Sequence, residues 1–238
     1  EVQPMSGFRV ALGIPYYRSV EGPTLLSCMD LSARSAEAKV AMLPIGTSGC
    51  YVEDNRNGCV QYALNTGIDF THFLWIDGDM IFPGDALVRL LAHGKDIVGA
   101  NYRQRTPPYK HAGVYEDRSG APLSQSGLHR MIQLPTGLML VRFDIYRKMP
   151  YPWFKPGLHS EPRDDIYFCR QATAMGYEIW ADHDLTKEVR HITVQDIPWF
   201  APEQLVQVKG AEIDLVESAA AGKERAALSG EHYRVAAG

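Results

Sequence analysis

The sequence predicts an α/β protein with a mostly parallel central sheet and helices on both of its faces. Apolar runs of strand length alternate with amphipathic runs of helical spacing between residues 8 and 102. Glycine or proline marks most of the boundaries between these runs. Such alternation is typical of parallel sheets, because each return to the same edge requires a crossover helix that packs on the sheet.

The elements of the first half follow in chain order. Their patterns predict a strand at 8–17, a helix at 22–38, a strand at 39–45, a helix at 52–67, a strand at 72–77, a helix at 84–94 and a strand at 96–102. Thr24 is a candidate cap of the first helix, and Gly67 follows the second. Pro83 and Gly94 bracket the third helix, which is the usual asymmetry of helix ends.

The regular alternation stops near Arg103. Residues 103–127 are rich in turn formers, so we expect loops and a small antiparallel region there. The patterns then predict a strand and a short helix at 133–149, an aromatic, proline-rich loop at 151–163, a helix at 164–176 and strands at 177–182 and 188–194. From residue 201 the composition shifts to Ala, Glu, Lys and Gly. We therefore divide the chain into a domain at 1–200 and a helical or extended tail at 201–238, a candidate for assembly into oligomers.

The bulk composition excludes several classes of protein. The 238 residues carry a formal charge of -4, with a pI near 6.1 and no basic run, which argues against a nucleic-acid partner. No apolar run is long enough for a transmembrane helix, and the N-terminus lacks a signal-peptide pattern. The four cysteines are scattered without a CxxC pair, so neither a disulfide framework nor a zinc site is expected. These observations predict a cytoplasmic protein.

The stretch LWIDGDMIFP, residues 74–83, carries the most informative chemistry. It ends a predicted buried strand with Asp77 and Asp79, separated by Gly78. Two carboxylates this close repel each other unless a cation lies between them or one is protonated. Mg²⁺ and Mn²⁺ prefer oxygen ligands and commonly bind through one or two carboxylates and the phosphates of a substrate. Ligands of open α/β sheets bind at the carboxyl ends of strands, so this position favours a metal site over an ordinary Asp-Gly turn.

The segment LWIDGDMIFPGDALVRLL resembles the DxD segment of GT-A glycosyltransferases of the family-2 type. The likeness in motif order extends over roughly residues 8–195. It includes the strand that ends in GIPYY, the Arg56-Asn57 pair, the LPTGLML stretch, and RDDIYFCRQATAMGYEIW followed by His191. The DDIYFC segment is similar to the Glu-Asp helix of the family, with Asp164 in place of the usual glutamate.

The resemblance implies a role for each acidic residue. Asp79 would be the main metal ligand, Asp77 would bind the metal through water or hold the ribose, and His191 would complete the metal site. Asp165 would be the general base that deprotonates the acceptor, with Asp164 as a helix cap or an acceptor contact. The ion would be Mn²⁺ or Mg²⁺, which neutralises a diphosphate leaving group. Acids at a helix N-terminus also stabilise the helix dipole, and a late histidine is often structural, so those alternatives stay open.

The remaining site residues follow from the same resemblance. The nucleotide sugar is expected across the ends of the first strands, on Pro15, Tyr16, Arg18, Arg56, Asn57, Asp77, Thr136 and Gly137. In the LPTG segment, a small residue would let the donor sugar and the acceptor meet above the sheet. Trp153, in the aromatic loop, is a candidate acceptor platform, or part of a lid that packs over the core.

Taken with the resemblance, these residues predict a metal-dependent glycosyltransferase. It would move a sugar from a UDP- or GDP-sugar to a hydroxyl acceptor, expected to be a saccharide or glycan, with inversion favoured and retention left open. One alternative is a nucleotidyltransferase, although GIPYYRSVEGP fits poorly to the Gly-rich loop and basic residue usual in that class. The other is a non-catalytic nucleotide-sugar- or carbohydrate-binding protein on the same fold.

Overall fold

A computed structural model of the chain describes residues 5–105, 107–117, 126–157 and 164–192. The tail expected at 201–238 lies outside the described residues, as does the boundary placed after residue 200. The tail and its role in assembly therefore stay predictions. Within the described residues, no helix combines the length and the apolar character needed to cross a bilayer.

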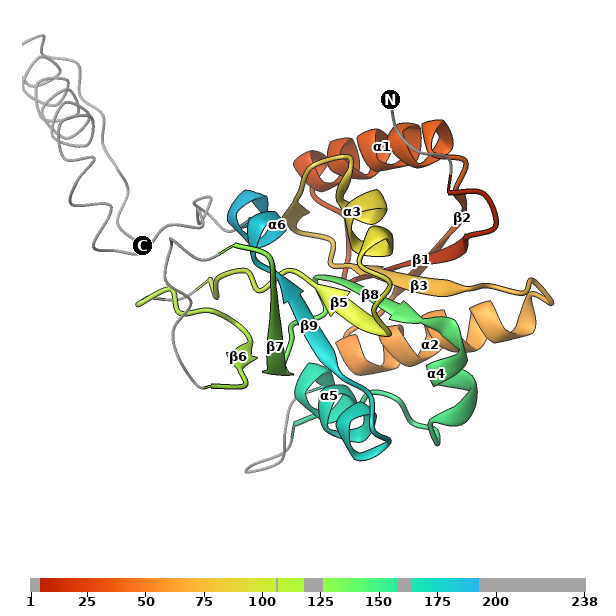
Figure 1. The fold of residues 1–238 in the computed structure, drawn as a ribbon. Coiled ribbons are helices and arrows are strands. Elements are labelled where there is room, and N and C mark those ends of the chain that lie inside the picture. Colours follow the sequence, from red (N-terminus) through yellow and green to blue (C-terminus); the bar gives the residue numbers. More distant parts are fainter. Residues whose placement is uncertain (1–4, 106, 118–125, 158–163, 193–238) are drawn as a thin grey trace, which may run out of the picture. The chain divides into compact units, whose positions relative to one another are not determined.

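The described residues form an eight-stranded sheet in the order β2-β1-β3-β8-β5-β9-β7-β6 (Figure 1). The strands are β1 (Arg9–Tyr16), β2 (Ala41–Ser48), β3 (His72–Ile76), β5 (Ile97–Gly99), β6 (Val114–Tyr115), β7 (Leu128–Gln133), β8 (Leu138–Arg142) and β9 (Ile179–Asp182). Strand β1 is parallel to β2 and β3, and β5 is parallel to β9. Strands β7 and β8 run against the common direction of the others. The predicted α/β class is confirmed.

Strand β8 is the main departure from the predicted sheet. The expected strand and short helix within 133–149 are present, but β8 inserts antiparallel between β3 and β5. Four of its five residues are buried, because both faces of this strand are covered, and a continuous apolar run is typical of such a strand. Such a run contains no signal of strand direction, and the sequence analysis therefore missed the antiparallel insertion.

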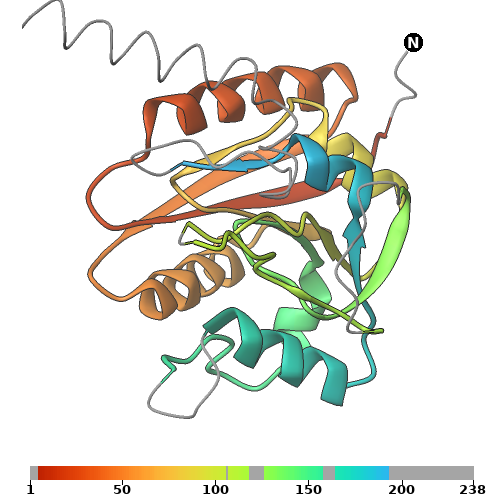
Figure 2. The ribbon, with the colours of Figure 1, turned by 90° about the vertical axis from the view of Figure 1, so that its left-hand side faces the viewer.

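Helices cover both faces of the sheet (Figure 2). The helices are α1 (Gly22–Glu37), α2 (Val52–Asn65), α3 (Ala86–Ala92), α4 (Phe143–Lys148), α5 (Asp164–Ala174) and α6 (His183–Glu188). Gly67 and Gly94, with φ of 72° and 59°, adopt the left-handed conformation just beyond α2 and α3, as predicted for helix ends. Helix α6 was not predicted; the Asp182 carboxylate caps it by accepting from Leu185 N at 2.8 Å.

Two apolar cores lie on opposite faces of the sheet. Phe73 and Trp75 of β3 pack in the core that includes side chains of α2, α4 and α5. Leu74 and Ile76, the alternate residues of the same strand, pack in the core that includes α1 and α3. This alternation follows from the two-residue period of a strand. Both faces of β3 are thus buried, which holds its carboxyl end in a fixed position.

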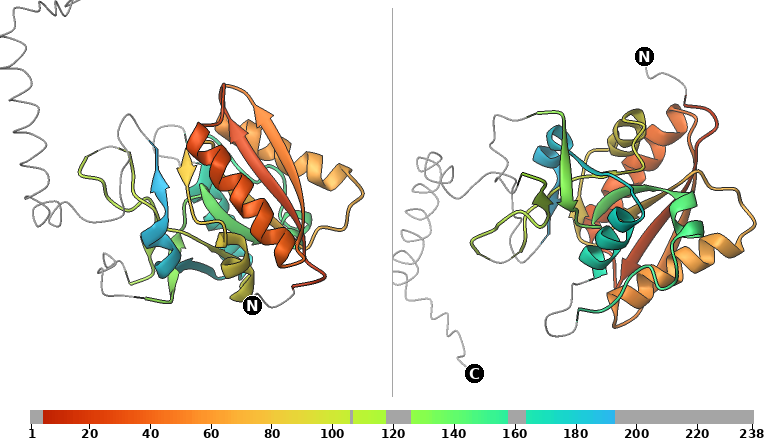
Figure 3. Two further views of the ribbon diagram at one scale, coloured as in Figure 1. Left: turned by 90° about the horizontal axis from the view of Figure 1, so that it is seen from above. Right: turned by 60° about the horizontal axis from the view of Figure 1, so that its bottom comes forward.

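A two-stranded ladder joins the DxD segment to the end of the described chain. Strand β4 (Met80–Ile81) pairs antiparallel with the short strand β10 (Arg190–His191) (Figure 3). Met80 is the direct partner of His191. The sequence analysis expected a longer late strand at 188–194. The shorter β10 still places His191 beside the turn that ends β3.

Candidate functional site

Three neighbouring segments fix the backbone of the DxD turn. The amide of Asp77 donates to the carbonyl of Gly137 at 3.2 Å, which ties the turn to the start of β8. The amide of Glu21, next to α1, donates to the carbonyl of Gly78 at 2.8 Å. The amide of Ile192 donates to the carbonyl of Asp79, also at 2.8 Å. The turn is therefore held at both ends and at its centre.

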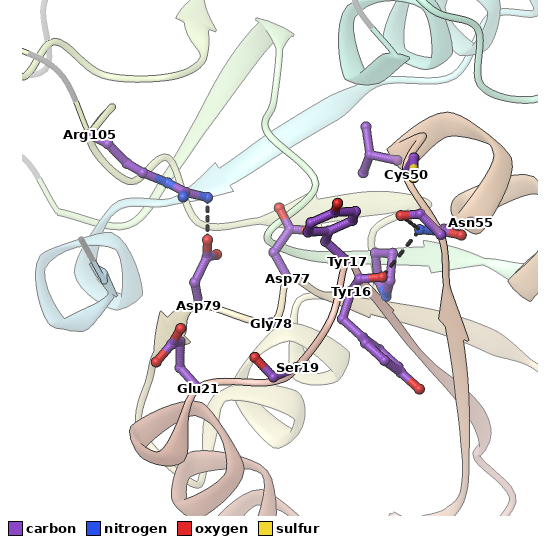
Figure 4. A pocket seen from close by; sticks show the side chains of 13 residues that line it. Tyr16, Tyr17, Ser19, Glu21, Cys50, Asn55, Asp77, Gly78, Asp79 and Arg105 are labelled. Atoms are coloured by element: carbon purple, nitrogen blue, oxygen red, sulfur yellow. Dashed lines mark hydrogen bonds and ion pairs between the residues drawn. The ribbon is translucent and has the colours of Figure 1, made fainter. Parts of the chain in front are cut away.

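Asp79 and His191 lie side by side and share one cationic partner. Asp79 Oδ1 lies 3.5 Å from His191 Nε2. Arg105, from the segment that follows β5, donates from Nε to His191 Nε2 at 2.7 Å and from Nη2 to Asp79 Oδ2. Figure 4 shows the guanidinium directed at the Asp79 carboxylate. Asp79 Oδ1 is buried and has no hydrogen-bond partner of its own.

The hydrogen-bond partners of His191 favour one tautomer of its ring. Its Nδ1 lies 3.1 Å from the carbonyl oxygen of Arg103, which can only accept, so Nδ1 carries the proton. Its Nε2 accepts from Arg105 and thus presents a lone pair. The ring of Tyr102 packs edge-on against the imidazole, with 5.2 Å between centroids. A neutral imidazole whose far nitrogen is held by a carbonyl is the state in which histidine binds metals.

Asp77 is directed instead toward the buried Arg56. Arg56 Nη2 lies 2.9 Å from Asp77 Oδ1, and its Nε donates to Asp164 Oδ2 at 2.7 Å. The guanidinium is 5% exposed and lies 5.7 Å and 5.9 Å from the ring centroids of Trp75 and Phe154. A buried charge is stable when it is paired and hydrogen-bonded. This bridge joins the end of β3 to the first turn of α5.

The two aspartates of the turn have opposite pKa shifts. Burial raises the pKa of Asp77; Arg56 opposes that shift, and Asp79 reinforces it. Burial also opposes the ionisation of Asp79, whereas the charge of Arg105 favours it, and the net effect is a lowered pKa of Asp79. Asp79 is therefore fully ionised at neutral pH, as a metal ligand must be.

Asp165 lies in the first turn of α5 and has the properties of a proton acceptor. Burial, together with the adjacent charge of Asp164, raises the pKa of Asp165 from 3.8 to about 6. Its Oδ1 accepts from the amide of Ile166 at 2.8 Å, which orients the carboxylate. A carboxylate with a pKa near 6 is ionised at pH 7 yet is a stronger base than an ordinary aspartate.

Two cavities meet at Arg105. The first, which we call the tyrosine cleft, has a volume of about 290 Å³ and is lined by the segment after β1, the region around the start of α2 and the DxD turn (Figure 4). The second, which we call the Asp165 cavity, has a volume of about 560 Å³ and is lined by Tyr102, Gln104, Asp165 and His191, among others. Arg105 lines both. The site is therefore a pair of adjoining spaces with the Asp79–His191 pair at their junction.

Several residues expected to bind the nucleotide lie at or beside the tyrosine cleft. Pro15, Tyr16 and Asp77 line it. The guanidinium of Arg18 stacks over the ring of Tyr17, 5.0 Å from its centroid, and Tyr17 also lines the cleft. These residues therefore lie where a nucleotide in the cleft could contact them, and the contact itself stays a prediction.

The LPTG segment is buried and packs against the DxD turn. Thr136 is buried, and the amide of Gly137 donates to the hydroxyl of Tyr102 at 2.9 Å. A side chain at Gly137 would collide with the Tyr102 hydroxyl, so glycine allows this close approach. The small residue thus admits Tyr102, whereas the sequence analysis expected it to admit substrates.

Three residues that the sequence analysis expected to contact substrate are buried in the core. Arg56 is sequestered between Asp77 and Asp164 and supports the site from beneath. Asn57 holds the aromatic loop: its amide donates to the carbonyl of Phe154, and its Oδ1 accepts from the amides of Trp153 and Phe154. Trp153 itself is 5% exposed, so its ring is covered by protein and does not form an open acceptor platform.

The sequence analysis missed Arg105 and Tyr102, which both contact His191. Arg105 lies in RQRTPPYK, where turn formers hide the functional residue among loop signals. Tyr102 ends the expected fourth strand and reads as an ordinary apolar position. The sequence did place both residues at or just beyond the end of the expected strand at 96–102. The carboxyl end of that strand lies at the same edge of the sheet as the DxD turn.

Metal-binding capacity rests on two side chains. Asp79 supplies an unpartnered buried oxygen, and His191 supplies a neutral nitrogen 3.5 Å away. In the part of the chain that the structure describes, no three His, Cys, Asp or Glu side chains converge on one point. The donor set fits a divalent ion that takes its other ligands from water and substrate phosphates, as Mg²⁺ does. Asp77, expected as a third ligand, is engaged by Arg56.

No protein-family model and no curated protein sequence matches the chain. Solved structures do match it. A197 from STIV is 15% identical, with a TM-score of 0.54 over 78% of this chain and 86% of that one, which shows a shared fold. The catalytic domain of Drosophila β1,4-galactosyltransferase 7, in complex with xylobiose, is 15% identical, with a TM-score of 0.49 over 78% and 71%. GalNAc-T7 with UDP, GalNAc and Mn²⁺ is 10% identical, with a TM-score of 0.46 over 78% and 44%.

Proposed function

We propose that this chain is a glycosyltransferase that uses Mn²⁺ or Mg²⁺ to transfer a sugar from a UDP- or GDP-sugar to a hydroxyl acceptor. The observation that supports it best is the meeting of three groups at one edge of the sheet. Asp79 and the neutral His191 form a pair of cation ligands, and Asp165 is a carboxylate of raised pKa in the adjoining cavity. Metal-assisted displacement of a diphosphate by a hydroxyl requires a cation site beside the diphosphate and a base beside the attacking hydroxyl.

The two cavities suit the two substrates. The tyrosine cleft lies at the carboxyl ends of β1 and β3, where open α/β sheets bind ligands, and it has aromatic walls on which a base can pack. We assign the nucleotide to this cleft. The Asp165 cavity then receives the acceptor, because Asp165 and His191 both line it. The anomeric carbon of the donor would lie at the junction of the two cavities.

The charge of the cavity walls supports a metal requirement. The described acidic residues that line the two cavities are Glu21, Asp77, Asp79 and Asp165, while Arg105 is the one lining arginine or lysine among the described residues. A nucleoside diphosphate is itself an anion, so these walls repel it unless a cation is added. Asp79 and His191 would hold that ion, whose chemistry is to neutralise the charge that develops on the leaving diphosphate.

Asp165 would take the proton of the acceptor hydroxyl. Its carboxylate is oriented by the amide of Ile166 and needs no metal contact for this step. A base on the acceptor side favours attack opposite the leaving group, and therefore inversion of the sugar. Asp164 would hold the end of α5 through its bond to Arg56.

The function is tested by incubating the protein with a panel of UDP- and GDP-sugars, with and without Mn²⁺, and measuring nucleoside diphosphate release. We expect release with one donor class in the presence of Mn²⁺, and loss of that release in Asp79→Ala. Asp69→Ala is the matched control, because Asp69 is an exposed carboxylate that pairs with Arg9 and Arg147 away from the cavities. Retention of activity in Asp79→Ala would refute the proposed metal site.

The same panel separates the alternative functions. A non-catalytic binding protein would be stabilised thermally by a nucleotide sugar and release no diphosphate. A nucleotidyltransferase would instead produce pyrophosphate from a nucleoside triphosphate and a sugar phosphate. Either result would replace the glycosyltransferase proposal.

A further inference from the structure

Arg105 projects from a hairpin-like loop that reaches the DxD turn from a distant part of the sequence. The base of this loop is closed by Gln104 N donating to Lys110 O at 2.8 Å and by Ala112 N donating to Tyr102 O at 2.9 Å. The Arg105 side chain is 52% exposed, whereas those of its two partners are 20% and 11% exposed. The guanidinium therefore approaches a largely buried pair from the solvent side, and its removal would not require the core to open.

The guanidinium occupies the His191 nitrogen that a metal ion would use, and it also holds the carboxylate of Asp79 through its other oxygen. Its Nε is bonded to His191 Nε2, and its Nη2 is bonded to Asp79 Oδ2. A nitrogen lone pair that accepts from an N–H cannot at the same time coordinate a metal. Two positive charges at this distance would also repel each other. Arg105 in this position and a bound divalent ion are therefore mutually exclusive.

Arg105 does not satisfy the pair completely. Asp79 Oδ1 stays buried with no hydrogen-bond partner, although the guanidinium is adjacent. A buried carboxylate oxygen without a partner is a cost to the protein, and a divalent ion that bound both Asp79 and His191 would remove it. The unpartnered oxygen of Asp79 indicates that Arg105 satisfies the pair less completely than a bound cation would.

We propose that Arg105 is a placeholder cation that balances the Asp79–His191 pair and is displaced when the divalent ion binds. The inference rests on the proposed function only for the presence of that ion. It adds that metal affinity is set by competition with the protein's own side chain. Arg105 already lines both cavities. Once the ion has displaced it, the guanidinium would therefore stay close to the departing diphosphate.

The test is the affinity of Mn²⁺ alone, measured by calorimetry and by the electron paramagnetic resonance of free Mn²⁺, for the full chain and for Arg105→Ala. We expect Arg105→Ala to bind Mn²⁺ about fivefold more tightly or better, the factor that corresponds to loss of one partly exposed ion pair. Arg105→Gln, which keeps hydrogen-bonding capacity but removes the charge, should behave in the same way. Arg142→Ala is the matched control, because Arg142 is 49% exposed and pairs with two aspartates elsewhere.

The added Mn²⁺ affinity should disappear when Asp79→Ala is combined with Arg105→Ala. Equal Mn²⁺ affinity in the unaltered chain and both Arg105 variants would overturn the proposal, and so would absence of Mn²⁺ binding in all of them. The measurement contains no nucleotide, so it is independent of the transferase assay. Tighter Mn²⁺ binding in a chain that releases no diphosphate would uphold the placeholder and reject the proposed function.

Discussion

Asp77 and Asp79 lie two positions apart in one turn, and each is paired with an arginine of a different kind. Asp77 contacts Arg56, which is almost fully buried between aromatic rings and also binds Asp164. Asp79 contacts Arg105, which is half exposed and comes from a loop. The first pair is part of the framework that positions β3 and α5, and the second is an exchangeable contact. One motif thus combines a permanent ion pair with a replaceable one.

The largest expected effect concerns Asp165, which is anchored through its neighbour to the permanent pair. Asp165→Asn should lower transfer by about two to four orders of magnitude, the usual contribution of a general base. In the unaltered protein, transfer should fall below pH 6, because protonation of Asp165 removes the base. Rates across pH 5 to 8 would check both points. An active Asp165→Asn protein would refute the assigned base and favour retention of the sugar configuration.

A comparison of the two arginines tests the contrast directly. Arg56→Met should destabilise the fold by about 3–5 kcal/mol, because Asp77 and Asp164 would be left as unpaired buried charges. Arg105→Met should change the free energy of unfolding by less than about 1 kcal/mol, since its partners are reached from solvent. Urea unfolding of both variants at one pH measures the difference. Equal losses would show that the two ion pairs are energetically equivalent.

The raised pKa of Asp165 predicts a pH-dependent cost to stability. The folded protein holds this proton up to a pKa of about 6, against 3.8 for the ordinary group. Stability from the neutral form is therefore present below pH 4 and is lost as pH rises through 6, by up to about 3 kcal/mol. Asp165→Asn, which stays neutral, should match the unaltered protein at pH 4 and exceed it at pH 7. Urea unfolding at both values checks this, and a constant difference would contradict it.

The smallest effect concerns Cys50, which lines the tyrosine cleft and is exposed. Alkylation of its thiol should slow several-fold when a nucleoside diphosphate and Mn²⁺ occupy the cleft. The buried cysteines Cys28, Cys59 and Cys169 serve as internal references in the same mass spectra. Unchanged labelling of Cys50 at saturating nucleotide would place the nucleotide elsewhere.

The sequence was sufficient for the features that depend on order along the chain. The alternating elements, the position of the DxD turn after β3 and the approach of His191 all follow from strands that end at one edge. The sequence did not show which face of α2 is buried. Residues 55–57 are polar, and a polar run at a helix start suggests solvent exposure, yet all three are buried. Arg56 is paired with Asp164 and Asn57 with the aromatic loop, which are both remote in sequence, whereas Asn55 donates to the carbonyls of Tyr16 and Gly49.

The ladder of β4 and β10 separates the fold from its chemistry. The eight-stranded sheet is complete at β9, and His191 is supplied afterwards by a strand of two residues. So short a ladder has few hydrogen bonds and can open locally while the sheet stays folded. During synthesis, a nascent chain that ended at residue 182 would contain every strand of the eight-stranded sheet but only Asp79 of the two proposed cation ligands. The proposed cation pair is therefore completed only after the sheet, by a segment that the sheet itself does not contain.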